Sequence, residues 1–336
     1  MTDVTTTLSL TEAAGAWSTY WDKGALHSCP GAFAANYNDE ILVFWNNFFS
    51  TLSNGARVLD IGTGNGAIAF LARDAALALG RQFHIEGIDA AIIQPTEAAA
   101  KHGLAAGGVK FRGLTNAEQT GYPTASCDAI SSQYAIEYMN VNACLQEISR
   151  ILKSDGKAAL LMHHADSEAV STTRAELKVL DFLHHEAPLL QSAFRLLNRL
   201  EEFGKTRDPG LIMQDTESRK QMKDIEKLLK KVTQYARSRP NAGFAEGIAL
   251  QIAGVLQRTP ASGAASALAS LRLLEQEMKA HQARLKSMLK AGLSQEGIEE
   301  FCELSRNNGL IPSAPELLYR SNKDLLGWTL ILRREL

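Results

Sequence analysis

The chain has 336 residues, of which 45% are hydrophobic and 21% charged, a composition that excludes a disordered, collagen-like or coiled-coil chain. No stretch approaches the ~18 consecutive apolar residues of a membrane span, and the first residues lack the pattern of a signal peptide, so we expect a cytoplasmic protein with no membrane contact. The formal net charge of -2 gives no overall attraction to DNA or RNA, so we expect no nucleic-acid partner.

Residues 1–52 are predicted to form helices and loops rich in aromatic side chains, which we interpret as a helical cover. The run RVLDIG, from Arg57 to Gly62, is short, apolar and closed by glycine, as is typical of a strand buried on both faces of a parallel sheet. Strands and helices then alternate, which predicts a doubly wound, mostly parallel α/β sheet. The expected strands are 57–62, 84–89, 108–113, 127–134 and 157–164, and the expected helices are 67–79, 96–102 and 141–152.

The alternation stops at Asp166, and residues 166–291 show helical spacing with almost no strand signal. We interpret this segment as an all-α insertion with turns at proline- and glycine-containing positions. Its expected helices are 168–203 with a break at Pro188, 215–238, 244–257 and 262–290.

The sheet pattern returns after the insertion. Ser294 is a predicted N-cap for a helix that ends near Asn308. Two β-rich runs separated by residues 321–323 then predict a hairpin with an antiparallel strand near one sheet edge. Residues 53–165 and 292–336 therefore form one predicted α/β domain.

The insertion is the basic part of the chain, with 20 Lys and Arg against 15 Asp and Glu between residues 166 and 291. Lysines at helical spacing within 219–239 form one face of a predicted helix, opposite an apolar stripe. A solvated face over a buried face explains this pattern. The alternative hypothesis is a docking surface for an acidic carrier protein or peptide.

The four cysteines are far apart and form no CxxC pair, which excludes the usual spacings of zinc sites and thioredoxin-like motifs. We therefore predict free thiols and no metal site. The cysteines are Cys29, Cys127, Cys144 and Cys302.

The most specific motif is Asp60-Ile-Gly62-Thr-Gly64-Asn-Gly66, between the first strand and the first helix. Glycine has no Cβ and tolerates positive φ, so such a loop lets a ligand lie against backbone N–H groups. The glycines with Ala67 also satisfy the GxGxxA pattern of dinucleotide-binding proteins, so they leave NAD as an alternative. The carboxylate of Asp60, two residues before the first glycine, suits a cationic ligand group and favours a different nucleoside.

This loop resembles the first motif, VLDxGxGxG, of the class I S-adenosylmethionine-dependent methyltransferases. The resemblance covers roughly residues 57–164 and the last forty residues, and it implies a Rossmann-like fold with S-adenosylmethionine as cofactor. By this resemblance Asp89 accepts from the ribose hydroxyls, residues 116–118 lie beside the adenine, and Gln133 or Tyr134 faces the methyl donor. The implied cofactor-binding residues are Asp60, Gly62, Gly64, Gly66, Asp89, Ala90, Asn116, Ala117, Gln133 and, from the N-terminal segment, Tyr20. Trp21, next to Tyr20, is a second candidate to close over the cofactor, and core packing is the alternative for both.

We therefore predict transfer of a methyl group to an oxygen or nitrogen of a small molecule, with a natural-product intermediate as the candidate acceptor. The run SSQY at residues 131–134 differs from the Asn/Asp-Pro-Pro-aromatic box of enzymes that methylate amino groups of nucleic acids, so that substrate class loses support. The insertion is expected to cap the carboxyl ends of the strands, to select the acceptor and to contribute a homodimer contact. A peptide or protein methyltransferase and a cofactor-binding interaction protein without turnover are the alternatives.

The candidate catalytic residues are His163 and His164, which follow the fifth predicted strand. Ligands in open α/β sheets bind outside the carboxyl ends of the strands, and histidine is a natural general base near neutral pH. One of the pair would take a proton from the acceptor. A purely structural role, with hydrogen bonds to backbone or to Asp166, is the equally weighted alternative.

Overall fold

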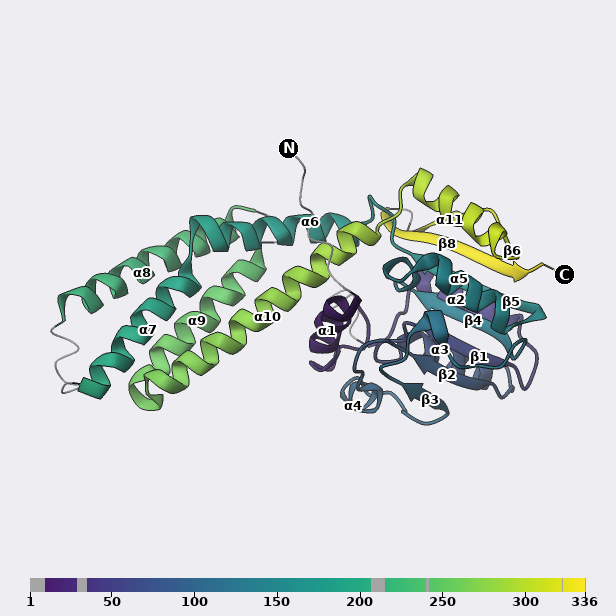
Figure 1. The fold of residues 1–336 in the computed structure, drawn as a ribbon, viewed down its shortest axis with the longest axis horizontal. Coiled ribbons are helices and arrows are strands. Elements are labelled where there is room, and N and C mark those ends of the chain that lie inside the picture. The colour runs from purple at the N-terminus through teal and green to yellow at the C-terminus, as the bar shows by residue number, and fades with distance from the viewer. Residues whose placement is uncertain (1–9, 29–34, 207–214, 240–241, 322, 336) are drawn as a thin grey trace. The chain divides into compact units, whose positions relative to one another are not determined.

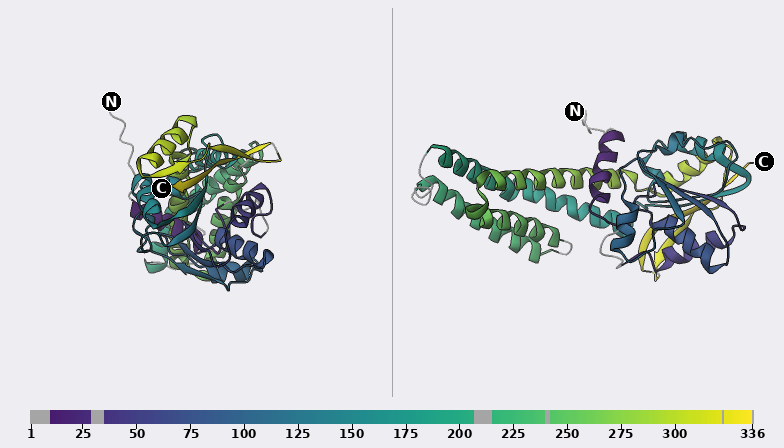
Figure 2. Two further views of the ribbon diagram at one scale, coloured as in Figure 1. Left: turned by 90° about the vertical axis from the view of Figure 1, so that its right-hand side faces the viewer. Right: turned by 90° about the horizontal axis from the view of Figure 1, so that it is seen from below.

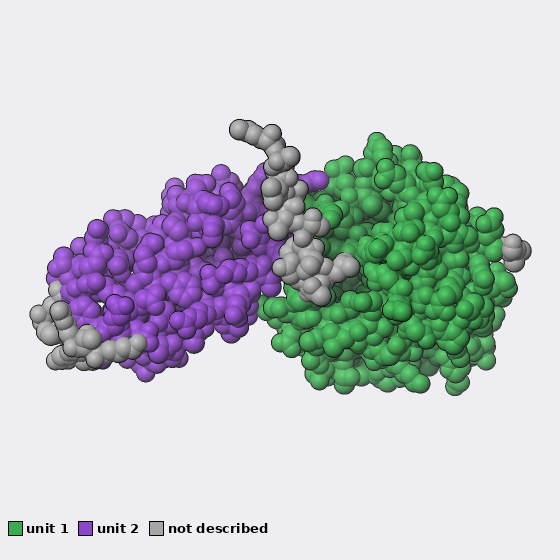
Figure 3. All heavy atoms as spheres, in the orientation of Figure 1, with its two compact units in different colours: residues 1–171, 287–336 green, residues 172–286 purple. Residues whose placement is uncertain are grey.

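The protein is described by a computed structural model that covers residues 10–28, 35–206, 215–239, 242–321 and 323–335. Cys29, one of the predicted free thiols, lies outside the described residues, whereas Cys127, Cys144 and Cys302 are buried free thiols. The chain divides into two compact units, residues 1–171 with 287–336 and residues 172–286 (Figure 3). The predicted insertion, 166–291, encloses the second unit.

The first unit contains a mixed sheet. Its strands are β1 (Arg57–Ile61), β2 (His84–Ile88), β3 (Val109–Arg112), β4 (Cys127–Gln133), β5 (Leu152–Met162), β6 (Leu310–Pro312), β7 (Glu316–Arg320) and β8 (Asp324–Arg334). The sheet order is β3-β2-β1-β4-β5-β8-β6, with β7 also paired to β8 (Figure 1). Strands β1 to β5 are parallel and β8 is antiparallel to β5, which confirms the predicted fold class.

Helices cover both faces of this sheet. They are α1 (Leu10–Trp21), α2 (Glu40–Ser50), α3 (Ala67–Ala78), α4 (Pro95–Lys101), α5 (Val141–Ile151) and α11 (Gln295–Asn307), with short 3₁₀ turns η1 (Ala117–Gln119) and η2 (Ile136–Tyr138). Successive strand residues point to opposite faces, so Val58 joins a core with α2 and α3 while Leu59 joins a second core with α5 and α11. In β1 the side chains on both faces are buried from Val58 to Ile61, which explains why the run RVLDIG is apolar there except for Asp60.

The second unit is helical. It contains η3 (Phe182–Glu186), a single π-type turn, followed by α7 (Leu189–Thr206), α8 (Thr216–Arg237) and α9 (Gly243–Ser262). Two further helices, α6 (Glu168–Asp181) and α10 (Ala264–Ala291), cross from one unit into the other. Helices α7 to α10 lie side by side (Figures 1 and 2) around a core that includes Leu197, Ile225, Val232, Ile252 and Leu271. No helix among the described residues is long and apolar enough to cross a bilayer.

Two boundaries and one short strand differ from the sequence prediction. The helix expected to stop before Pro260 continues through it to Ser262, because a proline in the last turn removes only one helical hydrogen bond. Strand β5 begins at Leu152, five residues early, since Leu152 pairs with Cys127 of β4 before a bulge shifts the register and the pairing resumes at Lys157. The short strand β6 was not predicted. The break at Pro188 and the N-cap at Ser294, whose side chain accepts from Gly297 N, are confirmed.

Candidate active site

The glycine loop leaves the carboxyl end of β1 with all three motif glycines at positive φ: 67° at Gly62, 52° at Gly64 and 93° at Gly66. A Cβ on Gly62 would lie 2.2 Å from the Cβ of Ala135, and one on Gly64 would lie 2.5 Å from the ring of Trp21. Both the backbone conformation and the close approach of neighbours therefore require glycine here.

Asn65, between two of these glycines, has no exposed surface and connects three parts of the chain. Its side-chain nitrogen donates to the carbonyl oxygens of Trp21 and Ala25, at 3.0 and 2.7 Å. Its side-chain oxygen accepts from the backbone N–H of Gln94, at 2.7 Å. The loop thus holds the end of α1 and the start of α4 against itself.

Two carboxylates stand beside the loop. Asp60 is 2% exposed and accepts from Ser131 Oγ at 2.7 Å, and burial raises its pKa to about 7. Asp89, at the end of β2, accepts from the backbone N–H groups of Gly64 and Ala91, each at 2.8 Å. Burial also raises the pKa of Asp89, and each of its oxygens retains lone pairs after these bonds.

A cavity of about 1080 Å³ lies within the first unit at the carboxyl ends of the strands. This volume is slightly above the ~300–1,000 Å³ range of ligand pockets. It brings together most of the predicted cofactor-binding residues, namely Asp60, Gly62, Asp89, Ala90, Asn116, Ala117 and Gln133. Gly64 and Gly66 lie behind it, covered by the rings of Trp21 and Phe111.

The N-terminal segment contributes one of the two aromatic residues expected to close over the cofactor, Trp21, and one that was not expected, Trp17. Tyr20 does not line the cavity, because its hydroxyl donates to the His27 carbonyl at 2.9 Å and its ring packs edge-on against Trp21. Trp17 and Trp21 line the cavity instead, stacked with ring centroids 5.6 Å apart. Helical spacing alone did not reveal which of these neighbouring aromatic residues faces inward, but the close contact with Gly64 does.

The end of β4 forms another part of the lining. Gln133 Oε1 accepts from the indole N–H of the fully buried Trp45, at 2.5 Å, which fixes the side-chain amide. Tyr134 follows with φ 52°, an uncommon conformation for a non-glycine residue. Its hydroxyl donates to Leu326 O at 3.1 Å, and its ring lies 4.2 Å from that of His163.

Neither predicted catalytic histidine lines the cavity. His163 is 1% exposed, and its Nδ1 lies 2.8 Å from a carboxylate oxygen of the equally buried Glu137. His164 Nδ1 accepts from the backbone N–H of Asp166 at 2.9 Å, its ring lies over Trp328, and burial lowers its pKa. These contacts with protein groups are those that the structural alternative expects.

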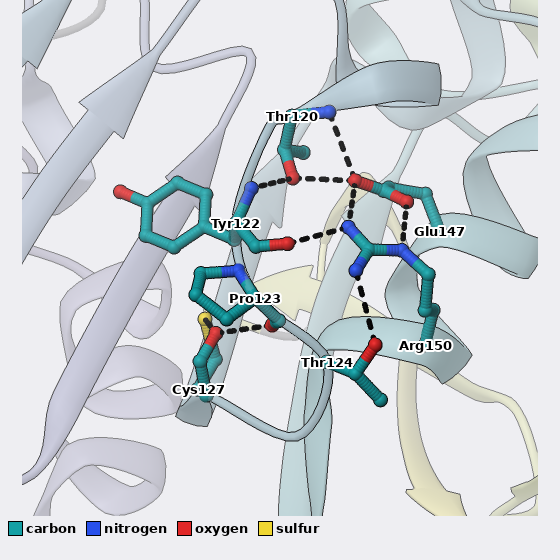
Figure 4. Close-up of polar contacts among 8 residues, drawn as sticks. Thr120, Tyr122, Pro123, Thr124, Cys127, Glu147 and Arg150 are labelled. Carbon is teal, nitrogen blue, oxygen red and sulfur yellow. Dashed lines mark hydrogen bonds and ion pairs between the residues drawn. The ribbon is translucent and has the colours of Figure 1, made fainter.

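Residues 114–122, which we call the wall segment, run from β3 towards β4, and all of them except Thr120 line the cavity. The segment includes η1 and the predicted residues Asn116 and Ala117. A polar cluster fastens its second half to α5, where Glu147 bonds to Thr120 and Arg150 bonds to the Tyr122 carbonyl (Figure 4). Sequence patterns did not indicate this cluster.

These features define an open α/β protein with a nucleoside-sized site at the carboxyl ends of its strands, where such folds bind ligands. The model of a methyltransferase domain family matches residues 52–292, and the chain belongs to this family. The methyl donor of such a domain is S-adenosylmethionine, and the residues in the cavity fit it. The lone pairs of Asp89 suit a vicinal diol, and the buried carboxyl of Asp60 suits a cationic group.

Solved structures share parts of the fold at low similarity. The YcgJ protein of Bacillus subtilis is 24% identical over 40% of this chain and 57% of its own, with a TM-score of 0.31. The PH0226 protein of Pyrococcus horikoshii is 21% identical over 37% of this chain and 54% of its own, with a TM-score of 0.31. Geranyl diphosphate C-methyltransferase of Streptomyces coelicolor, in complex with S-adenosyl-L-homocysteine, is 16% identical over 46% of this chain and 66% of its own, with a TM-score of 0.32.

The chain thus spans little more than half of the first two of these proteins. No curated protein matches the chain. Among the described residues, no cluster of three or more His, Cys, Asp or Glu side chains could hold a metal ion.

Proposed function

We propose that the protein transfers the methyl group of S-adenosylmethionine to an oxygen or nitrogen of a small molecule, for which a natural-product intermediate is the candidate class. The observation that carries this proposal is the cavity of about 1080 Å³, which is large enough for a nucleoside cofactor and a compact acceptor together. Its lining combines the glycine-loop residues with aromatic side chains of the N-terminal segment, as an apolar acceptor would require.

When bound, S-adenosylmethionine supplies an electrophilic methyl group. The residues of the chain then need to hold donor and acceptor in line and to exclude water. Asp60 and Asp89 are placed to orient the cofactor, and the amide of Gln133, fixed by Trp45, is placed to orient a polar group beside it. His163 and His164 are not assigned the role of general base in this scheme, since neither lines the cavity.

Two measurements test the proposal. Isothermal titration should show binding of S-adenosylhomocysteine but not of NADH. A loop that binds a pyrophosphate is preceded by apolar residues, whereas here the carboxylate of Asp60 precedes the glycines. Incubation with S-adenosylmethionine and a panel of small hydroxyl- and amine-bearing compounds, analysed by mass spectrometry, should yield S-adenosylhomocysteine and a product heavier by one methylene. Tight NADH binding without S-adenosylhomocysteine binding would refute the cofactor.

The helical unit is proposed to select the acceptor and to provide a dimer contact. The alternative of a peptide or carrier-protein acceptor depends on the exposed lysines of α8, among them Lys220, Lys223 and Lys227. Replacing these three with Gln would abolish turnover only for a docked acidic partner. Methylation of a free small molecule at the wild-type rate by the triple variant would support the small-molecule proposal.

A further inference from the structure

We propose that Glu147 and Arg150 are positioning residues that set cofactor affinity by fixing the wall segment, 114–122. This inference rests on the proposed binding of S-adenosylmethionine in the cavity. The wall segment has little regular structure of its own, with one 3₁₀ turn and a residue, Leu114, at φ 52°. Its position must therefore come from bonds to neighbouring elements.

The first half of the wall segment is attached to the end of β2. The backbone N–H of Leu114 donates to Ala91 O at 3.2 Å, and that of Thr115 donates to Asp89 O at 2.9 Å. These bonds place the start of the segment beside the carboxylate predicted to bind the ribose. They do not reach the second half, which begins after η1.

The second half is held by a charged pair on α5 (Figure 4). Glu147 is 8% exposed, and its Oε1 accepts from Thr120 N at 2.9 Å and from Thr120 Oγ1 at 2.5 Å. Arg150 donates to both oxygens of Glu147, at 2.7 and 2.8 Å, and through Nη2 to the Tyr122 carbonyl at 2.7 Å. Burial alone would raise the pKa of Glu147, but the bonds from Arg150 and Thr120 outweigh it and lower the pKa.

A second arginine holds the same stretch from the β3 side. Arg112 donates to the Thr120 carbonyl at 3.3 Å, and its guanidinium lies 5.3 Å from the centre of the Tyr122 ring. The N–H and C=O of Thr120 and the C=O of Tyr122 are thus all bonded to side chains from α5 or β3. Side chains thus satisfy the polar groups of a backbone that has no strand partner.

Both oxygens of Glu147 and three nitrogens of Arg150 are engaged with protein groups, with Nη1 bonded to Thr124 Oγ1 at 3.3 Å. They are therefore not groups that recognise a ligand directly, although both line the cavity. They act through the wall segment, and their removal should leave that segment mobile in the absence of ligand.

The test compares Arg150→Met with Arg199→Met, which removes a two-bond Arg–Asp215 pair of the same geometry in the helical unit. Hydrogen bonds to charged groups contribute enough that we expect S-adenosylhomocysteine to bind Arg150→Met about tenfold or more weakly, by isothermal titration. Arg199→Met should bind it within about twofold of wild type. Hydrogen exchange of the ligand-free protein should accelerate at residues 120–122 in Arg150→Met while β1 and β4 amides stay protected.

A wild-type dissociation constant in Arg150→Met would overturn the proposal, as would a loss of affinity of equal size in Arg199→Met. If Arg150→Met does not fold, Thr120→Val decides the question, since it leaves the ion pair and removes only the two bonds of the hydroxyl, to Glu147 and from the Tyr122 N–H. Weaker binding with faster exchange at 120–122 would then support the proposal, and unchanged binding would overturn it. Failure of the wild-type protein to bind S-adenosylhomocysteine would instead overturn the proposed function, together with this inference.

Discussion

At the scale of single residues, the glycine-loop motif predicts the kind of ligand, and tertiary packing decides which neighbouring side chains line the cavity. Asp60 and Asp89 could be placed at the site from the sequence, because they lie at or just after the carboxyl ends of parallel strands, whereas Gln133 was expected there from the family resemblance. The choice of Trp21 over Tyr20 could not, since adjacent helix positions differ by about 100° and the register of α1 on the loop is a tertiary property. Nor could the sequence show that His163 and His164, which follow β5, are not part of the cavity lining.

Asp60 makes the stability of the ligand-free protein depend on pH. Burial raises its pKa in the folded state from 3.8 to about 7, so its contribution to stability is fully present below about pH 4 and is lost as the pH rises through 7. Relative to Asp60→Asn, the wild-type protein should therefore lose stability between pH 5 and pH 7.5, measured by urea unfolding. Parallel curves for the two proteins over this range would contradict the prediction.

The same carboxyl couples cofactor binding to a proton. A cationic ligand favours the ionised form, so the dissociation constant of S-adenosylmethionine should rise by up to about tenfold per pH unit below 7. Titrations in two buffers of different ionisation enthalpy would count the released proton. Asp60→Asn is the control, for which proton release should disappear.

His163 is predicted to stabilise the fold. His163→Gln leaves the buried Glu137 with a weaker partner, so we expect a loss of about 1–3 kcal/mol in the free energy of unfolding. Turnover, once an acceptor is known, should keep its pH profile. A fall of about 10²-fold or more in turnover, with cofactor affinity and stability intact, would restore the general-base hypothesis.

At the scale of elements, the alternating strands and helices could be predicted because central strands such as β1 and β4 are buried on both faces and stretches of helical spacing separate the strands. The boundaries that failed, at Pro260 and Leu152, lie where a single local signal was overruled by continued helix or by strand pairing. The wall segment carries no periodic pattern, and its attachment depends on side chains 27 positions apart in sequence, Thr120 and Glu147. No reading of local sequence reveals such a contact.

The end of α1 is expected to contribute to the site rather than only to the fold. Trp21→Ala removes the ring that lies against Gly64 and one side of the cavity lining. We expect S-adenosylhomocysteine to bind at least about tenfold more weakly, since burial of an aromatic ring typically contributes more than 1.4 kcal/mol. Trp328→Ala, in β8 and outside the cavity lining, is the matched control and should leave affinity near that of wild type while lowering stability.

At the scale of the whole molecule, the two units have separate cores, and the cavity is built from the first unit alone. Ile252→Ala, in the core of the helical unit, should cost about 2–5 kcal/mol of that unit's stability and leave S-adenosylhomocysteine binding unchanged. Ile130→Ala, in the sheet, should reduce both the stability of the first unit and the affinity for S-adenosylhomocysteine. Equal loss of affinity in the two variants, measured by titration below the unfolding transition, would show that the units do not act independently.

Asn65 has a structural role that the glycine motif itself does not specify. In the pattern GxGxG the second x is open to any residue, yet here it carries the amide that bonds to Trp21, Ala25 and Gln94. The N-terminal segment and this one position are therefore a matched set. A chimaera that exchanges residues 10–28 for those of another protein would have to exchange Asn65 as well, and natural variation at the two places should be correlated.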